Sequence, residues 1–93
     1  MSVSAPLAAI RAQHPLLHCI SNIVSANDCA NLALAIGASP IMAQAPQEMA
    51  DIAALAGAVV LNTGTPDEAK FAAARTAGAT ANCRSIPVVL DPV

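Results

Sequence analysis

The sequence contains no tryptophan and no tyrosine, and Phe71 is its single aromatic residue. Proteins that bind single-stranded nucleic acid stack the bases on several aromatic side chains, so this class of surface is excluded. Basic residues are also scarce, because four Lys and Arg side chains are scattered over 93 residues and the formal net charge is −2. Duplex nucleic acid and anionic membranes are bound by clustered basic residues, and no such cluster is present.

Long apolar runs and a disulfide framework are absent as well. The most apolar stretch, residues 53–61, is roughly half the length that a bilayer requires and is interrupted by Gly57, so no transmembrane helix is expected. Residues 1–13 lack the basic segment and the long apolar run of a secretory signal. The three cysteines are odd in number and widely spaced, which indicates reduced thiols in a cytoplasmic protein.

The chain is rich in apolar residues and in alanine. Apolar residues make up 56% of the sequence, a fraction that excludes intrinsic disorder. The length allows one domain or part of one. Alanine accounts for about a quarter of the residues, far above ordinary usage, which suggests helices that approach a sheet closely.

Short apolar runs rich in β-branched residues alternate with longer alanine-rich stretches. The short runs predict buried strands at residues 16–20, 39–42, 58–62 and 87–91. The stretches between them predict helices over residues 4–13, from Ser25 to a stop at Gly37, from Pro46 to Gly57, and from a capping box at Thr65 to Gly78 or slightly beyond. Strands and helices that alternate at these lengths predict an α/β fold with a mostly parallel central sheet.

Polar or turn-forming residues follow each predicted strand: Asn22, Gln44, Gly64 with Thr65, and Asp91. The carboxyl ends of parallel strands meet at one edge, where α/β proteins bind ligands. One interpretation is a small polar ligand that hydrogen-bonds to Asn22, with Asp91 organising a cation or a water molecule. In the other interpretation Asn22 and Thr65 only cap helices and Asp91 only forms a turn. The pattern alone leaves both open.

Signals for other kinds of site are weak. Gly64 and Thr65 could present backbone amides to an anion, but neither a P-loop nor a GxGxxG fingerprint is present, and the local pattern favours a capped strand-to-helix turn. His14 and His18 are not spaced as a metal pair. His18 and Cys19 are neighbours on a strand and face opposite ways, which argues against a Cys–His catalytic pair. Spacing alone gives Met42 only the role of a core residue.

The order of the sequence blocks is more specific than any single motif. The segment 15–22, PLLHCISN, resembles the PLVHCITN opening of the hydroxyethylthiazole kinase family. The resemblance continues in the family's order and spacing through LAIGASPIMA at 34–43, AGAVVLNTGT at 56–65 and IPVVLDPV at 86–93. These blocks cover nearly the whole chain from Pro15.

The resemblance implies a ribokinase-like, three-layer α/β fold, of which residues 1–93 form the N-terminal βαβ units of a single, incomplete kinase domain. It implies ATP-dependent, Mg2+-assisted phosphorylation of the hydroxyl of 4-methyl-5-(2-hydroxyethyl)thiazole in thiamine biosynthesis, by a cytoplasmic homotrimer with sites between subunits. By motif, Met42, Asn22 and Val24 are similar to the substrate-binding residues. Asp91 is similar to the aspartate near Mg2+ and phosphate, and Gly64 and Thr65 would shape the same edge.

The family's glycine-rich anion hole, catalytic cysteine and main ATP-binding residues lie beyond position 93, so no catalytic residue is assigned within this chain. Cys19, Cys29 and Cys83 do not match the family's catalytic position. The chain alone is therefore expected to lack kinase activity, because phosphoryl transfer needs these groups around the γ-phosphate. Two alternatives are another ribokinase-like kinase, such as a pyrimidine or pyridoxal kinase, and a non-catalytic truncated product.

Overall fold

The computed structural model describes residues 3–21, 24–43, 45–64 and 68–91, in which helices and strands alternate. The elements are α1 (Ser4–Gln13), β1 (Leu16–Ile20), α2 (Ala26–Ala35), β2 (Ser39–Ile41), a 3-10 turn η1 (Pro46–Glu48), α3 (Met49–Leu55), β3 (Ala58–Asn62), α4 (Glu68–Cys83) and β4 (Val88–Asp91). The strands form one sheet in the order β2-β1-β3-β4, and all three pairings are parallel. The predicted α/β class and parallel sheet are confirmed.

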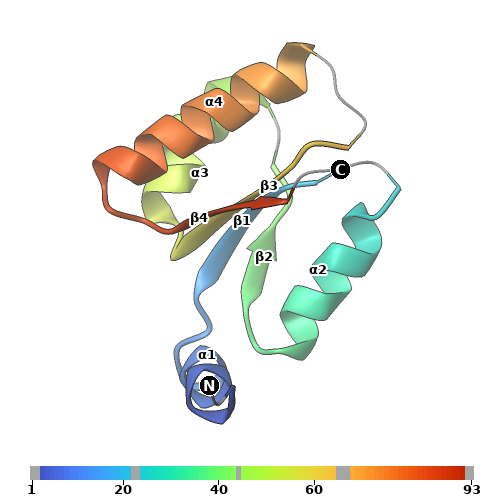
Figure 1. Ribbon diagram of the computed structural model, residues 1–93, viewed down its shortest axis with the longest axis vertical. Helices are drawn as coiled ribbons and strands as arrows, with labels where there is room; N and C mark the ends of the chain where they lie inside the picture. Colours follow the sequence, from blue (N-terminus) through green and yellow to red (C-terminus); the bar gives the residue numbers. More distant parts are fainter. Residues whose placement is uncertain (1–2, 22–23, 44, 65–67, 92–93) are drawn as a thin grey trace.

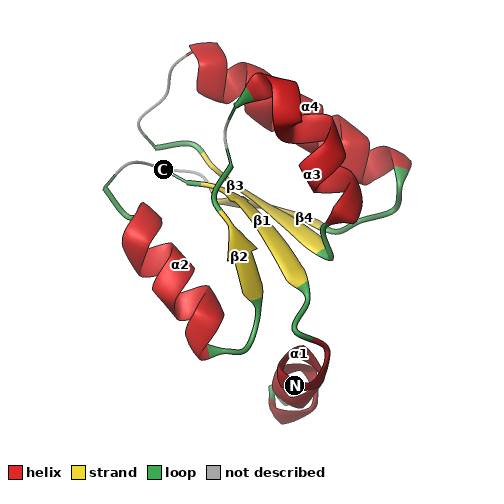
Figure 2. Ribbon diagram, turned by 180° about the vertical axis from the view of Figure 1, so that it is seen from behind, coloured by secondary structure: helices red, strands yellow, loops and turns green. Residues whose placement is uncertain are grey.

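The helices cover both faces of the sheet (Figures 1 and 2). Helix α2 lies on one face, and α3 and α4 lie together on the other, so the strands form the middle layer of three. Helix α1 lies beside the amino ends of the strands. At the opposite edge the strands end and are followed by loops. In parallel sheets this carboxyl edge is the usual place for a ligand.

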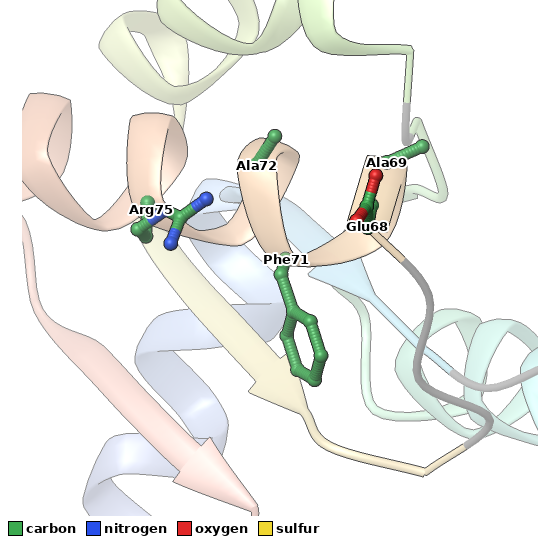
Figure 3. A pocket seen from close by; sticks show the side chains of 5 residues that line it. All are labelled: Glu68, Ala69, Phe71, Ala72 and Arg75. Atoms are coloured by element: carbon green, nitrogen blue, oxygen red, sulfur yellow. The ribbon is translucent and has the colours of Figure 1, made fainter.

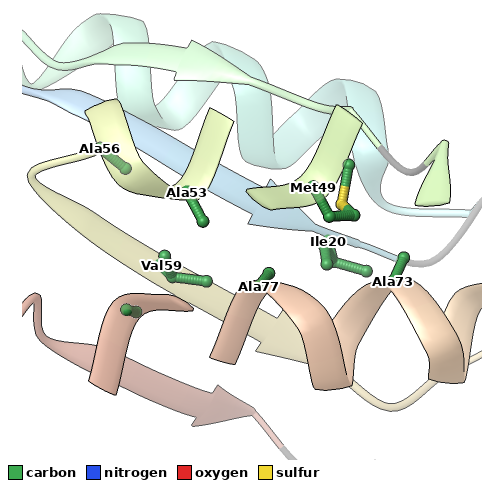
Figure 4. Packing of buried hydrophobic residues seen from close by; sticks show 8 residues of the cluster. Ile20, Met49, Ala53, Ala56, Val59, Ala73 and Ala77 are labelled. Carbon is green, nitrogen blue, oxygen red and sulfur yellow. The ribbon is translucent and has the colours of Figure 1, made fainter. Parts of the chain in front are cut away.

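The core lies between the sheet and the α3–α4 layer, and alanine dominates it (Figure 4). Ile20, Val59 and Met49 are fully buried there, together with five alanines from α3, α4 and the turn after α3: Ala53, Ala56, Ala73, Ala77 and Ala81. Short side chains let these helices approach the strands closely, as the composition predicted. The last three alanines follow each other at intervals of four residues along α4, so they share one face of the helix.

The turn from α2 to β2 requires a glycine at position 37. Gly37 has φ +100°, and the backbone N–H groups of Gly37 and Ala38 donate to the carbonyls of Leu34 and Ala33. These two bonds form a Schellman motif, which confirms the predicted helix stop. A Cβ at Gly37 would lie 2.9 Å from the Arg11 Cα, so α1 also packs against this turn too closely for a side chain.

Some predicted boundaries were wrong. Helix α4 does not end near Gly78 but continues to Cys83, because Gly78 lies inside a helix whose alanine face still packs on the sheet at Ala81. The third helix begins as a 3-10 turn at Pro46 and ends at Leu55, before Gly57. Strand β2 ends at Ile41, which leaves Met42 in the following loop. Ser25 is the N-cap residue of α2, but its side chain forms no capping hydrogen bond.

Candidate functional site at the carboxyl edge of the sheet

Asn62 and Asp91 lie opposite each other where β3 and β4 end, because the strand register pairs these two residues. The Asn62 Nδ2 group donates to Asp91 Oδ2 at 2.7 Å. The other end of the same amide, Oδ1, accepts a hydrogen bond from the Gly64 N–H at 2.8 Å. One side chain therefore fixes both the Asp91 carboxylate and the turn that follows β3.

Lys70 extends this arrangement into the interior. It lies in the first turn of α4, is only 5% exposed, and donates through Nζ to the Gly64 carbonyl. A buried ammonium group needs such partners, because desolvation of an unpaired charge is costly. The structure thus brings Gly64 and Asp91 together as the sequence predicted, and adds Asn62 and Lys70. Lys70 could have been found from its spacing, since positions 70, 73, 77 and 81 share one face of α4.

Met42 lies in the loop after β2 and is half-buried. The next residue, Ala43, is tied to β1, because its carbonyl lies 3.1 Å from His18 Nε2. Strands β2 and β4 are the two outer strands of the described sheet, so their ends are separated by three strand spacings, about 14 Å. The structure therefore places Met42 and Asp91 at the same edge but does not bring them into contact.

The remaining predicted site residues lie on the surface or outside the described residues. Val24 precedes α2 and is 86% exposed. Asn22, Gln44 and Thr65 lie outside the described residues, so the predicted hydrogen bond from Asn22 and the capping box at Thr65 stay predictions. Gly64 is partly buried, and Asp91 is exposed.

Two shallow pockets lie along α4, and the sequence analysis did not predict them. The first is formed by one stretch of the helix, and Figure 3 shows Phe71 projecting from α4 between Glu68 and Arg75. The second runs between α4 and β4 and is mostly apolar; its lining includes Leu61, Phe71, Gly78, Val88 and Leu90. Val89 and Leu90 are exposed on β4, the last strand of the described sheet. Val88 and Leu90 face α4 and line this pocket, whereas Val89 lies on the other face of the sheet.

The cysteines and carboxylates do not form a metal centre in the described part of the chain. No group of three or more His, Cys, Asp or Glu side chains among these residues is placed to hold a metal ion. Cys19 is buried and Cys83 is exposed, and all three thiols are free. Burial raises the pKa of the Cys19 thiol above its ordinary value, and the nearby Cys29 raises it further. Across the described residues, none of the helices has the length and apolar character of a membrane span.

Curated relatives align with most of this chain. A hydroxyethylthiazole kinase from Methanoculleus marisnigri is 55% identical over 87 residues, which are 94% of this chain and 31% of the relative. One from Glaesserella parasuis is 54% identical over 87 residues, or 94% of this chain and 32% of the relative. The chain therefore spans about a third of the length of the curated relatives that it matches.

The fold agrees with the sequence match. The structure of a hydroxyethylthiazole kinase protein from Pyrococcus horikoshii OT3 superimposes with a TM-score of 0.90 at 41% identity, covering 95% of this chain and 35% of that chain. The sequence profile of the Hydroxyethylthiazole kinase family matches residues 7–93. This match includes all four strands and the edge formed by Gly64 and Asp91. Because the family profile matches almost the whole chain, the chain belongs to the hydroxyethylthiazole kinase family.

Proposed function

We propose that the protein to which this chain contributes transfers the γ-phosphoryl group of ATP to the hydroxyl of 4-methyl-5-(2-hydroxyethyl)thiazole, in thiamine biosynthesis or salvage. The observation that carries the proposal is the family match over residues 7–93. The parallel sheet supports it, because two predicted site segments, at Met42 and at Asp91, leave the same edge of that sheet.

In this proposal Met42, Asn22 and Val24 contact the thiazole. Met42 is half-buried in the loop directly after β2, so its thioether offers an apolar wall next to the end of the strand. The separation of about 14 Å between the ends of β2 and β4 suits a site in which the thiazole ring and the phosphate-transfer chemistry occupy different ends. Gly64 and Thr65 would shape the end nearer to Asp91.

Asp91 would hold Mg2+ together with the phosphates of ATP. The donor chemistry fits, because Asp91 is exposed and the Asn62 amide bonds to one of its carboxylate oxygens, Oδ2, at 2.7 Å. Kinases commonly bind Mg2+ through one or two carboxylates, substrate phosphates and water rather than through an all-protein cage. When bound, Mg2+ would neutralise charge that develops on the phosphates. This chain's own contribution is to hold the Asp91 carboxylate in a fixed orientation.

We further propose a homotrimer in which the thiazole lies between neighbouring subunits, acting in the cytoplasm. In this arrangement Val24, which is 86% exposed, would be covered by the neighbouring subunit. The free thiols of Cys19, Cys29 and Cys83 agree with a reducing compartment.

The test compares two proteins. One is the 93-residue chain alone, and the other is a chimera in which these 93 residues replace the corresponding third of the Methanoculleus marisnigri relative. ADP release is measured with the thiazole alcohol and Mg-ATP. We expect turnover by the chimera and none by the chain alone, since phosphoryl transfer needs groups that surround the γ-phosphate. A folded chimera that phosphorylates pyridoxal or a pyrimidine, but not the thiazole alcohol, would refute the proposal.

A further inference from the structure

The side chain of His18 lies in the interior, on β1, and has no exposed surface. The register places it between Ile41 of β2 and Val59 of β3. It shares a face of the strand with Ile20, which belongs to the core under α3 and α4. A polar ring in such a position requires hydrogen-bond partners, because burial without them is costly.

The contacts of the ring fix its tautomer. His18 Nε2 lies 3.1 Å from the carbonyl oxygen of Ala43. A carbonyl can only accept, so Nε2 carries the hydrogen and donates it. The other nitrogen, Nδ1, is buried and has no partner among the described residues, so it holds the lone pair. His14 shows the reverse arrangement, because its Nδ1 donates to the Gly37 carbonyl at 2.8 Å.

The hydrogen bond joins two positions that are 25 residues apart, at the point where the chain leaves β2. The strand ends at Ile41, so Met42 and Ala43 are the first residues that the sheet no longer holds. The His18–Ala43 bond attaches this segment to β1 beyond the end of the β2 ladder, and Ala43 also packs against the core under α3 and α4. Met42 directly precedes Ala43 in the chain, so this bond holds the backbone beside Met42.

We propose that His18 is a positioning residue for substrate binding: through its Nε2–H it holds the Met42–Ala43 segment in place and so sets the affinity for the thiazole alcohol. The proposal rests on the proposed function for its substrate. The tautomer of His18 and the attachment of the Met42–Ala43 segment do not depend on which substrate is bound.

The first experiment uses the unmodified 93-residue chain without ligand. Long-range proton–nitrogen NMR spectra distinguish the two tautomers of each histidine. We expect the Nε2–H form for His18. Methyl-labelled methionine gives signals for Met1, Met42 and Met49, and His18→Leu should shift or broaden the Met42 signal. An Nδ1–H tautomer for His18, or a Met42 signal that does not respond, would overturn the proposal.

The second experiment compares His18→Gln with His18→Asn in the chimera. The glutamine amide nitrogen falls near the position of Nε2 and can still donate to Ala43, whereas the asparagine amide falls near Nδ1 and cannot. We expect His18→Asn to raise the KM for the thiazole alcohol about ten-fold. His18→Gln should stay within about two-fold of the parent, because the donor to the Ala43 carbonyl is retained. The KM for ATP should change in neither variant.

If His18→Asn and His18→Gln have equal KM values for the thiazole alcohol, the positioning role is refuted. It is also refuted if a variant raises the KM for the thiazole alcohol and the KM for ATP equally, and His18 is then a core residue. A chimera that does not use the thiazole alcohol at all would refute the proposed function instead. In that case the NMR spectra of the chain still decide whether His18 holds the Met42–Ala43 segment.

Discussion

The side-chain amide of Asn62 holds Asp91 on one side and the backbone of Gly64 on the other, with distances of 2.7 and 2.8 Å. The donor end of the amide faces the carboxylate, and the acceptor end faces the N–H group. This orientation suits an ionised Asp91, which can only accept. Asn62 thereby joins the ends of β3 and β4. No other side chain of the same shape can both donate to the carboxylate and accept from the N–H group.

Replacing Asn62 should therefore weaken both contacts. We expect Asn62→Ala to lower the free energy of unfolding by about 1–2 kcal/mol, because two hydrogen bonds are lost. Asn62→Asp should cost more, since it places a second carboxylate opposite Asp91. Urea denaturation measures both changes. The control is Asn82→Ala, which removes an exposed amide from the last turn of α4; if it destabilises the chain as much as Asn62→Ala, the linking role of Asn62 is wrong.

Met42 and Met49 form a matched pair that separates substrate contact from core packing. Met49 has no exposed surface, so Met49→Ala should lower stability by roughly 2–5 kcal/mol. Met42 is half-buried in a loop, and Met42→Ala should weaken binding of the thiazole alcohol by about 1–3 kcal/mol with little loss of stability.

The measurements for this pair are the thiazole KM, the ATP KM and the melting temperature of the chimera. The ATP KM should stay unchanged in Met42→Ala. A large fall in the melting temperature of Met42→Ala, with an unaltered thiazole KM, would show that Met42 is a structural residue and not a substrate contact.

The outer surface of α4 and β4 predicts self-association of the 93-residue chain. Leu90 is 62% exposed on the outermost described strand, beside the apolar pocket that Phe71 also lines. Exposed strand edges and apolar patches favour association. Sedimentation should show oligomers that Leu90→Lys reduces. Leu55→Lys is the control, because Leu55 is equally apolar and 76% exposed at the end of α3. A monodisperse monomer of the unmodified chain would contradict this prediction.

The three thiols should react with iodoacetamide at different rates. Cys83 is exposed, Cys29 is half-buried and Cys19 is buried, so we expect alkylation in that order. The raised pKa of Cys19 slows its reaction further, because the thiolate is the reactive form. Peptide mass spectrometry of partly alkylated chain gives the order directly. Equal rates for Cys19 and Cys83 in the folded chain would show that β1 is not covered by α2 as the structure has it.

The raised pKa of Cys19 also makes stability depend on pH. Burial, and then the neighbouring Cys29, raise this pKa in the folded state, so the folded chain binds the proton more tightly than the unfolded chain. This contribution is complete below the ordinary thiol pKa of about 8.5 and decreases as the pH rises toward the higher folded value. Urea denaturation from pH 7 to 10 should show a decline that Cys19→Ala reduces. An identical decline in that variant would assign it to other groups.

The sequence predicts those features that depend on local pattern, and it misses those that depend on contacts between distant residues. The apolar runs located β1 and β3 at their observed bounds, and Gly37 marked the end of α2 because its positive φ is a local requirement. Gly78 was misleading, because the tertiary contact of Ala81 with the core extends α4 beyond a residue that would end an isolated helix.

The same distinction applies to the site. Asp91 ends β4 and Gly64 follows β3, so the rule for parallel sheets could place them at one edge. The bond between Asn62 and Asp91 needs the exact register of β3 and β4, and the bond between His18 and Ala43 needs the path of the chain after β2. Neither is encoded in a short motif. The sequence pattern raises only a metal ligand or a Cys19 partner as roles for His18, whereas its ring bonds to a carbonyl 25 residues away.

The alanine face of α4 has a geometrical consequence. Ala73, Ala77 and Ala81 repeat every four residues, so the surface that the helix presents to the sheet is nearly identical after each turn. A periodic surface packs equally well when displaced by one four-residue period, about 6 Å, and therefore cannot by itself define the position of the helix along its axis. Lys70 breaks the repeat, because only one axial position lets its ammonium group reach the Gly64 carbonyl. The polar residue at the end of the helix thus sets the alignment of an interface made almost entirely of methyl groups.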